Sequence, residues 1–264
     1  MNDFICDKGK IVLLISTMNY QRPICFDKNN GNMVVINQIS NLEHISENIK
    51  IESDVIFYHD YFETGLSKSR NRGIEQAKGF EFCCIADNDI YYVENYESII
   101  EKYFKEYPEA DVLTFQHYYQ GKIKRKTKRV FKHNLFTIMN VSSIEIVFKR
   151  SSILDNKIIF DTSFGLGADY VAGEENIFLS DCIKNNLNVY SINEPLSIHP
   201  EAGDGGVLND KYFLTRGAIF YRVYGGFSFF IGFLFAFKKS KKIREKFSSY
   251  YNILKGIIDY AKKK

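Results

Sequence analysis

Short apolar runs of strand length recur along the chain, and polar residues end each of them. Runs of this length between turn-forming residues are typical of strands that are buried in a sheet. The pattern predicts strands at Ile11 to Ser16, Met33 to Asn37, Asp54 to Tyr58, Phe82 to Ala86, Asp111 to Phe115 and Val189 to Ile192.

Amphipathic stretches lie between several of these runs and predict helices. Ser67 can cap the first helix, and Gly79 supplies a left-handed end. The second helix covers Tyr96 to Tyr107 and stops before Pro108. In the third, which follows Gly173, the residues expected to face the core are Ile177, Phe178 and Cys182.

Strands that alternate with helices form right-handed βαβ units around a sheet. The chain has 264 residues, of which 45% are hydrophobic and 25% charged, so it is long and apolar enough to bury a full core. We predict an α/β fold with a mostly parallel sheet flanked by helices, forming a catalytic domain over residues 1–215. Ligands of such sheets bind beyond the carboxyl ends of the strands.

Residues 216–264 form a C-terminal segment of different character. Its apolar run from Gly225 to Phe237 is shorter than the roughly 20 residues that cross a bilayer, so we expect it to lie in the interface or against the domain. Apolar residues from Phe247 to Ala261 then recur at helical spacing beside lysines, as in basic amphipathic helices that bind membranes. The alternative is a helix docked on the domain with its lysines in water.

The formal net charge of +3 hides an uneven distribution. Residues 238–264 contain ten Lys or Arg against Glu245 and Asp259, a net of +8, so the preceding residues carry 3 minus 8, or −5. The acidic body argues against a nucleic-acid partner, whereas the tail should be attracted to anionic lipids. Gly121 to Asn134 holds seven Lys or Arg and no acid, which indicates either a solvated hairpin or loop or a contact for a phosphate-bearing acceptor.

The cysteines and the amino terminus indicate a protein that is not exported. The start of the chain lacks a signal-peptide pattern. Five cysteines without a C-x-x-C pair predict free thiols rather than disulfides or a zinc site. They are Cys6, Cys25, Cys83, Cys84 and Cys182.

Two carboxylates, Asp87 and Asp89, flank Asn88 where the fourth apolar run ends. In an extended chain, residues two apart project to the same side, so both acids can face one ligand. Oxygen ligands of this kind suit Mg²⁺ or Mn²⁺, and such an ion could bridge a diphosphate. The alternative is an Asp/Asn turn that follows the strand for backbone reasons alone.

Two further segments carry candidate chemistry. The helix start near Gly65 could attract an anion, and Arg70 and Arg72 could orient a carboxylate or contact a phosphate. Farther along, a glycine-rich loop leads into Glu174 and Glu175, which could supply a general base. The alternative for the first segment is an ordinary helix start with exposed arginines. The alternative for the second is a pair of acids that only complement the dipole of the helix they begin.

In this order, the segments resemble the family 2 glycosyltransferases of the GT-A type, especially bacterial members that assemble capsular and other surface polysaccharides. The resemblance covers most of the chain and implies the Rossmann-like GT-A form of the predicted sheet. It rests on the first strand ending at residues 16–19, the G-x-S-x-x-R-N segment at 65–71, the D-x-D-like residues 87–89 and the acidic residues 173–176.

The resemblance implies a role for each motif in binding a nucleotide diphosphate sugar, expected to be a UDP-sugar. Asp87 would contact the ribose or help to hold the metal, and Asp89 would coordinate the Mn²⁺ or Mg²⁺ that bridges the diphosphate. His199 lies where some relatives place a metal or phosphate contact, the alternative being a loop histidine. The other donor-binding residues would be Thr17, Asn19, Gln38, Gly65, Arg70 and Asn88.

The family's catalytic acid usually reads Glu-Asp, so Glu175 is the expected base and Glu174 the second candidate. The resemblance implies an inverting transfer of a sugar to a hydroxyl of a lipid-linked glycan, at the inner face of the cell membrane.

A nucleotidyltransferase is a weaker interpretation, because no Gly-rich, Lys-bearing loop follows the first strand. A non-catalytic, membrane-associated module of a polysaccharide assembly complex is the other alternative.

Overall fold

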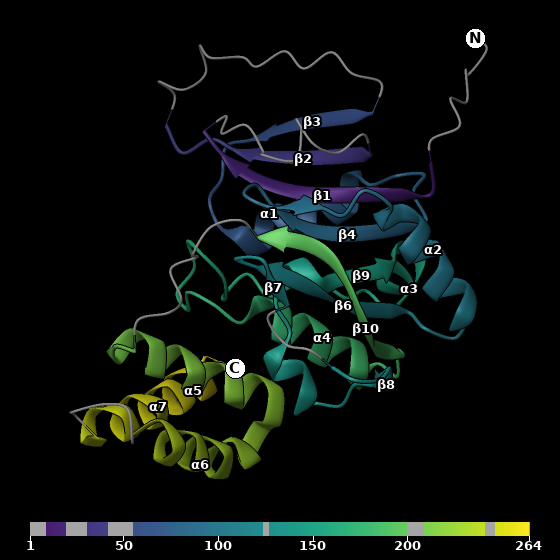
Figure 1. Cartoon of the computed structure of the whole chain (residues 1–264). Coiled ribbons are helices and arrows are strands. Elements are labelled where there is room, and N and C mark those ends of the chain that lie inside the picture. The colour runs from purple at the N-terminus through teal and green to yellow at the C-terminus, as the bar shows by residue number, and fades with distance from the viewer. Residues whose placement is uncertain are drawn as a thin grey trace.

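The computed structural model describes residues 9–19, 31–41, 55–123, 127–199, 208–240 and 246–263. Within these ranges a ten-stranded sheet has the order β3-β2-β1-β4-β9-β6-β10-β5, with β7 paired to β6 and β8 to β10 (Figure 1). Its first half is parallel and consists of β1 (Ile11–Met18), β2 (Asn32–Gln38), β3 (Ile56–Tyr61) and β4 (Phe82–Asp87).

The parallel half agrees with the predicted strands and sets the position of the first motif. Strands buried on both faces read as continuous apolar runs, which is why β1, β2 and β4 were visible in the sequence. β1 and β4 lie side by side, and Ser16 is in register with Asp87. The carboxyl ends of these two strands therefore meet at one edge of the sheet.

The second half of the sheet is mixed. The four-residue strand β9 (Ile146–Lys149), which the apolar pattern did not predict, runs antiparallel between β4 and β6 (Val112–Tyr119). The long strand β10 (Val189–His199) lies parallel to β6, with register shifts around Pro195. It brings His199 to the same edge as the end of β4. The remaining strands are β5 (Tyr91–Tyr92), β7 (Lys122–Ile123) and β8 (Phe131–Lys132).

Helices cover both faces of the sheet. An apolar core lies on each face of the sheet. On one face it is covered by α2, and on the other by α1 and α4. Ser67 was predicted to cap the first helix, but the N-cap is Gly65, two residues earlier, and Ser67 lies inside the first turn. The helices of this part are α1 (Leu66–Gln76), α2 (Tyr96–Glu106), α3 (Arg150–Asp155) and α4 (Glu174–Lys184), with the 3₁₀ helices η3 (Thr137–Asn140) and η4 (Ser143–Glu145).

The basic segment at residues 121–134 is not a separate hairpin. Its first strand, β7, pairs with β6, whereas its second, β8, pairs with β10. Residues 124–126 lie outside the described residues. Among the cysteines, Cys83, Cys84 and Cys182 are buried free thiols, and Cys6 and Cys25 also lie outside the described ranges.

The C-terminal helices form a layer beneath the sheet (Figure 1). They are α5 (Asp210–Tyr224), α6 (Ser228–Ser240) and α7 (Lys246–Ala261), with the 3₁₀ turn η5 (Gly225–Phe227) between the first two. One apolar face of α7 is buried, with Ile253, Ile257 and Tyr260 each less than 5% exposed, whereas other residues of the predicted stripe, Tyr251, Leu254 and Ile258, are exposed. The arrangement of α7 is thus that of a helix docked on the protein, and α5 runs through the boundary predicted at residues 215 and 216.

The stretch from Asp210 to Lys239 is long and apolar enough to cross a membrane by length and composition alone. It is nevertheless folded back on itself. The rings of Phe220 on α5 and Phe235 on α6 lie 5.2 Å apart. Fifteen residues of straight helix would separate them by about 22 Å. The stretch therefore forms two neighbouring helices rather than one rod.

The close crossing of α5 and α7 predicts a sensitive position. A Cβ atom at Gly217 would overlap the backbone of Ile253, whereas one at Gly226 would meet no atom. We expect Gly217→Ala to lower the melting temperature by several degrees, since overpacking costs about 1–3 kcal/mol. Thermal unfolding followed by circular dichroism should show little change for the control, Gly226→Ala. Equal melting temperatures for the two variants would contradict the packing of α5 on α7.

Candidate active site

A buried arginine joins two acids at the edge of the sheet. Arg70, on the first helical turns of α1, is only 2% exposed. Its Nη1 donates to Glu174 Oε1 at 2.7 Å, and its Nη2 donates to Asp87 Oδ1 at 3.1 Å. One guanidinium thus connects the end of β4 to the start of α4. Arg70 is suited to this because its planar group presents donors in a fixed fork.

The pKa values of this cluster follow from burial and charge. Burial alone would lower the pKa of Arg70, but the carboxylates of Glu174 and Asp87 raise it above its ordinary value. The guanidinium is therefore permanently charged. Phe160 covers one side, with its ring centre 5.5 Å from the guanidinium carbon. A charge enclosed in this way requires both acids, since an unpaired buried charge is costly.

The glycine-rich loop packs on the start of α1. The N–H of Leu66 donates to the carbonyl of Leu166, and Ser67 Oγ donates to the carbonyl of Phe164 at 2.6 Å. A Cβ atom at Gly167, which has a φ of +80°, would lie 3.2 Å from the Cα of Gly65. The glycines thus allow two backbone segments to approach each other. The glycine-rich loop therefore covers part of the start of α1, which was a candidate anion site.

Asn71 fixes the next segment of the same motif. Its side chain donates to the carbonyl of Phe160 at 2.9 Å and accepts from the N–H of Phe160 at 2.8 Å. Arg72 points elsewhere and pairs with Glu63 and Glu75. Of the two arginines considered, Arg70 alone reaches the acids of the proposed site.

The two acids of the D-x-D-like motif have different surroundings. Asp87 contacts Arg70, and Ser143 Oγ lies 3.5 Å from its second oxygen. Asp89, half exposed in the turn that follows β4, has its Oδ2 3.4 Å from His199 Nε2. The structure therefore brings together Asp89 and His199, which are 110 positions apart in the chain. Asn88 lies between the two acids and is partly exposed.

Asp89 and His199 fit a shared divalent cation. Two ligands of one ion lie roughly 3 Å apart when each metal–ligand distance is about 2.0–2.2 Å. The 3.4 Å between them is close to this separation, and His199 Nδ1 is buried without a hydrogen-bond partner. No group of three or more His, Cys, Asp or Glu side chains gathers around one point in the described part of the chain. Among these residues, an ion here would have two protein ligands.

Glu174 and Glu175 are adjacent in the chain but are held differently. The Glu174 carboxylate is buried and engaged by Arg70. Glu175 is partly exposed, and burial together with the charge of Glu174 raises the pKa of its carboxyl group above the ordinary value. Arg70 and Arg216 act in the opposite direction. A solvent-accessible carboxylate with a raised pKa is a stronger base than an ordinary glutamate.

The expected nucleotide edge lies at the ends of β1, β2 and β3. Thr17 Oγ1 donates to Asn37 Oδ1 at 3.3 Å, and Asn37 Nδ2 donates to Asp60 Oδ1 at 2.8 Å. Asp60 was not singled out in the sequence, yet it supplies an exposed carboxylate beside the end of β2. The parallel register of β2 and β3 places it there.

The other two residues expected at this edge have structural partners. Asn19 has a left-handed backbone with a φ of 52°, and its side chain exchanges hydrogen bonds with Ser40. Gln38 Nε2 donates to the carbonyl of Gly65 at 3.1 Å and is 3% exposed. Gln38 therefore orients the entry to α1, whereas Asn19 lies closer to solvent.

Two more residues, to which the sequence assigned no role, contact or act on this region. Asn176 donates to the carbonyls of Ile138 and Val141, which holds the segment before η4 against α4. Arg216 faces Glu175 from α5, and its charge opposes the rise in the pKa of Glu175. Asn176 belongs to the acidic segment and could have been found from it, but Arg216 depends on tertiary packing.

The Arg70 cluster predicts a large effect on stability. Arg70→Met should lower the free energy of unfolding by about 3 kcal/mol or more, because it leaves Glu174 buried and unpaired. Arg72→Met, two residues away on the same helix, should lower it by less than about 1 kcal/mol, since its ion pairs are exposed. Urea unfolding measures both. Similar losses would show that the Arg70 pairs contribute little.

The raised pKa of Glu175 predicts a stability change that depends on pH. Above the pKa of the unfolded chain, folding places a charge where burial and Glu174 oppose it, and glutamine removes this cost. Glu175→Gln should raise the melting temperature near pH 8. It should have little effect at about pH 4, where the Glu175 carboxyl group is largely neutral in both the folded and the unfolded protein. Scanning calorimetry across this range tests it, with Glu101→Gln on α2 as control. A gain that is independent of pH would contradict the proposed cause.

Comparison with solved structures identifies proteins of similar fold. The chain is similar to residues 1–349 of S. aureus TarS in complex with UDP-GlcNAc, with a TM-score of 0.66 and 15% identity, over 96% of this chain and 80% of that one. It is also similar to GalNAc-T7 in complex with UDP, GalNAc and Mn²⁺, with a TM-score of 0.60 and 12% identity, over 90% of this chain and 52% of that one.

At the level of sequence, no family model and no curated protein matches the chain. The identities of 12% and 15% mean that the likeness is one of fold. It confirms the α/β architecture expected from the sequence, with a central sheet flanked by helices. The chain therefore has a fold similar to that of glycosyltransferases of the GT-A type.

Proposed function

We propose that this protein is a glycosyltransferase that uses a nucleotide diphosphate sugar, most simply a UDP-sugar. The observation that carries the proposal is the buried Arg70, which joins Asp87 at the end of β4 to Glu174 at the start of α4. This contact sets a donor-side acid and a candidate base, Glu175, on the same edge of the sheet. The similar fold of TarS, solved with UDP-GlcNAc, and of GalNAc-T7, solved with UDP, supports the choice of donor.

The nucleotide would lie across the ends of the parallel strands, where ligands of such sheets bind. Thr17 lies near the end of β1, Asn19 follows that strand, and Asp60 lies near the end of β3. Asp87, already oriented by Arg70, would accept a hydrogen bond from a ribose hydroxyl. Gln38 and Gly65 would keep the start of α1 in place, while Asn88 would contribute to the wall of the site.

Asp89 and His199 would hold a divalent cation, Mn²⁺ or Mg²⁺. When bound, such an ion neutralises the negative charge that grows on a departing diphosphate. The residues of the chain contribute orientation: Arg70 keeps the end of β4 fixed through Asp87, and the turn after it presents Asp89. Because His199 ends the long strand β10, its position is set by the pairing of that strand with β6.

Glu175 would act as the base of an inverting displacement. The acceptor hydroxyl oxygen forms a bond to the anomeric carbon while the bond from that carbon to the diphosphate breaks. The hydroxyl proton passes to the Glu175 carboxylate, and the diphosphate leaves with the electron pair. Glu174 is the weaker candidate, because its carboxylate accepts from Arg70 at 2.7 Å.

The proposed acceptor is a hydroxyl of a lipid-linked glycan in surface polysaccharide synthesis. This would place the protein at the inner face of the cell membrane. The supporting observations are the net charge of +8 over residues 238–264 and the basic stretch between residues 121 and 134. Both would be attracted to phosphate groups of lipids.

The proposal predicts that donor binding and transfer can be separated. Asp89→Ala should weaken Mn²⁺-dependent UDP binding by roughly tenfold or more, which corresponds to about 1.4 kcal/mol. Glu175→Gln should bind UDP like the unaltered protein but lose roughly 10²- to 10⁴-fold in transfer or in donor hydrolysis. Calorimetry and a panel of nucleotide sugars measure these effects.

Asp155→Ala provides the control, since Asp155 is an exposed carboxylate at the end of α3. It should leave both properties unchanged. Unaltered UDP affinity in Asp89→Ala would contradict the metal assignment. Full turnover in Glu175→Gln would exclude Glu175 as the base.

A further inference from the structure

The outer face of α6 exposes large aromatic side chains. Its inner face includes small residues: Ser228 and Ala236 are fully buried, and Gly232 lies against Ile253 of α7. Phe235 also turns inward, toward Phe220 of α5, but most of the large side chains of the helix are exposed, unlike those of a helix that packs its whole apolar face on a core. The exposed side chains, each 47–58% accessible, are Phe229, Phe230, Phe233, Leu234 and Phe237.

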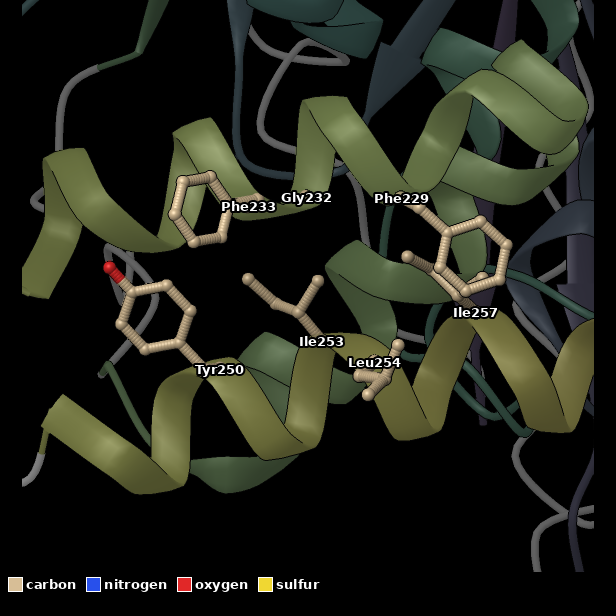
Figure 2. A pocket seen from close by; sticks show the side chains of 7 residues that line it. All are labelled: Phe229, Gly232, Phe233, Tyr250, Ile253, Leu254 and Ile257. Carbon is tan, nitrogen blue, oxygen red and sulfur yellow. The ribbon is translucent and has the colours of Figure 1, made fainter.

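An apolar groove continues this surface between α6 and α7. It has a volume of about 170 Å³. Figure 2 shows Phe229 and Phe233 on either side of Gly232, facing Ile253 and Leu254 on α7. The hydroxyl of Tyr250 is the polar side-chain group of the lining, and the Tyr250 ring lies 5.7 Å from that of Phe233. Contiguous apolar surfaces of this kind mark sites of interaction.

The charge around this surface identifies its partner. Between Phe237 and Glu245 the sequence contains five Lys or Arg and no Asp or Glu. Lys238 and Lys239 belong to the last turn of α6 itself. A second copy of the chain would bring like charges together, whereas an anionic bilayer complements them. Phenylalanines beside lysines are typical of helices that lie in the membrane interface.

The dimensions of α6 determine how it would meet a bilayer. Its 13 residues make a helix about 20 Å long, shorter than the hydrocarbon core of about 30 Å. The turn at Gly225 to Phe227 folds α5 back beside it. A helix of this length can lie parallel to the membrane plane with one face inserted.

We propose that α6 is a membrane-inserting element whose phenylalanine face enters the acyl region of an anionic bilayer, with a lipid chain occupying the groove between α6 and α7. This inference makes specific the membrane location included in the proposed function. It assigns the contact to α6, whereas α7, whose basic amphipathic pattern is visible in the sequence, mainly supports α6 and α5 through its buried face.

The inserted face would lie one helix away from the proposed base. α6 packs on α5 through Phe235 and Phe220. α5 also packs Ile219 against Gly173, the residue before Glu174, and the charge of Arg216 on α5 acts on Glu175. An acceptor anchored in the bilayer by a lipid tail could thus present its hydroxyl to the site without leaving the membrane.

The absence of tryptophan from the sequence permits a direct test. Phe233→Trp places a single indole on the inserted face, and Phe62→Trp places one on an exposed residue directly after β3, the strand that lies at the opposite end of the molecule from α6 (Figure 1). Each variant of the full chain is mixed with vesicles of phosphatidylcholine and phosphatidylglycerol in equal amounts. The emission of Phe233→Trp should shift to shorter wavelength, and lipids brominated on the acyl chains should at least halve it. Phe62→Trp should change in neither respect.

Three results would overturn the inference. One is an emission of Phe233→Trp that vesicles leave unchanged. Another is a blue shift that appears without vesicles and grows with protein concentration, which would assign the face to self-association. The third is equal binding to vesicles of phosphatidylcholine alone, which would remove the requirement for anionic lipid.

A second variant protects the test from local misfolding. Phe229→Ser combined with Phe233→Ser removes apolar groups that are already exposed, so the circular dichroism spectrum and the affinity for UDP should be retained. Flotation with the anionic vesicles should fall at least fivefold, while Phe62→Ser should float like the unaltered protein. Loss of flotation with intact UDP binding would support insertion. Flotation at the level of the unaltered protein would contradict it, and failure to bind UDP in every variant would instead count against the proposed transferase.

Discussion

The contact between Arg70 and its two acids is the constraint on which the site depends. Asp87 ends a strand, Glu174 begins a helix 87 positions later, and both reach one guanidinium that is closed off from water. Neither acid could be held in this orientation by its own element alone. The arrangement resembles other functional sites in that charges are buried where a reaction needs them, at some expense of stability.

The C-terminal helices are fixed to the sheet-containing part of the protein by a second arginine. Arg222 on α5 donates to both oxygens of Asp181 on α4, at 2.8 and 2.6 Å, and to Asp161 at 3.0 Å. Tyr260 on α7 donates to Asp161 at 3.1 Å. Helices α5 and α7 are thus both tied to Asp161, and α5 is also tied to α4, the helix that carries Glu175. A membrane contact made by these helices would act on the site through α5.

Much of the fold could be predicted from the sequence because buried parallel strands appear as continuous apolar runs. β9 could not, since its four residues follow a short 3₁₀ helix and carry no distinct period. The acids at residues 87, 89, 174 and 175 were identified by residue type and spacing. The pairing of Asp89 with His199 follows from the length of β10, which extends beyond the predicted Val189 to Ile192.

The residues that were not identified depend on contacts between distant segments. Asp60 reaches Asn37 through strand register, and the charge of Arg216 acts on Glu175 because α5 packs on α4. The character of α6 was likewise hidden. Its sequence is almost entirely apolar before Lys238, and only the packing of its small residues shows that four of its five phenylalanines point outward.

A double-mutant cycle between Arg70 and Glu174 tests the central contact most directly. The free energies of unfolding are measured in urea for Arg70→Met, Glu174→Gln and the double variant. If one buried pair organises the site, the double variant loses less stability than the sum of the single variants, with a coupling above about 1 kcal/mol. Losses that simply add would show that the two side chains act independently, and would contradict the account.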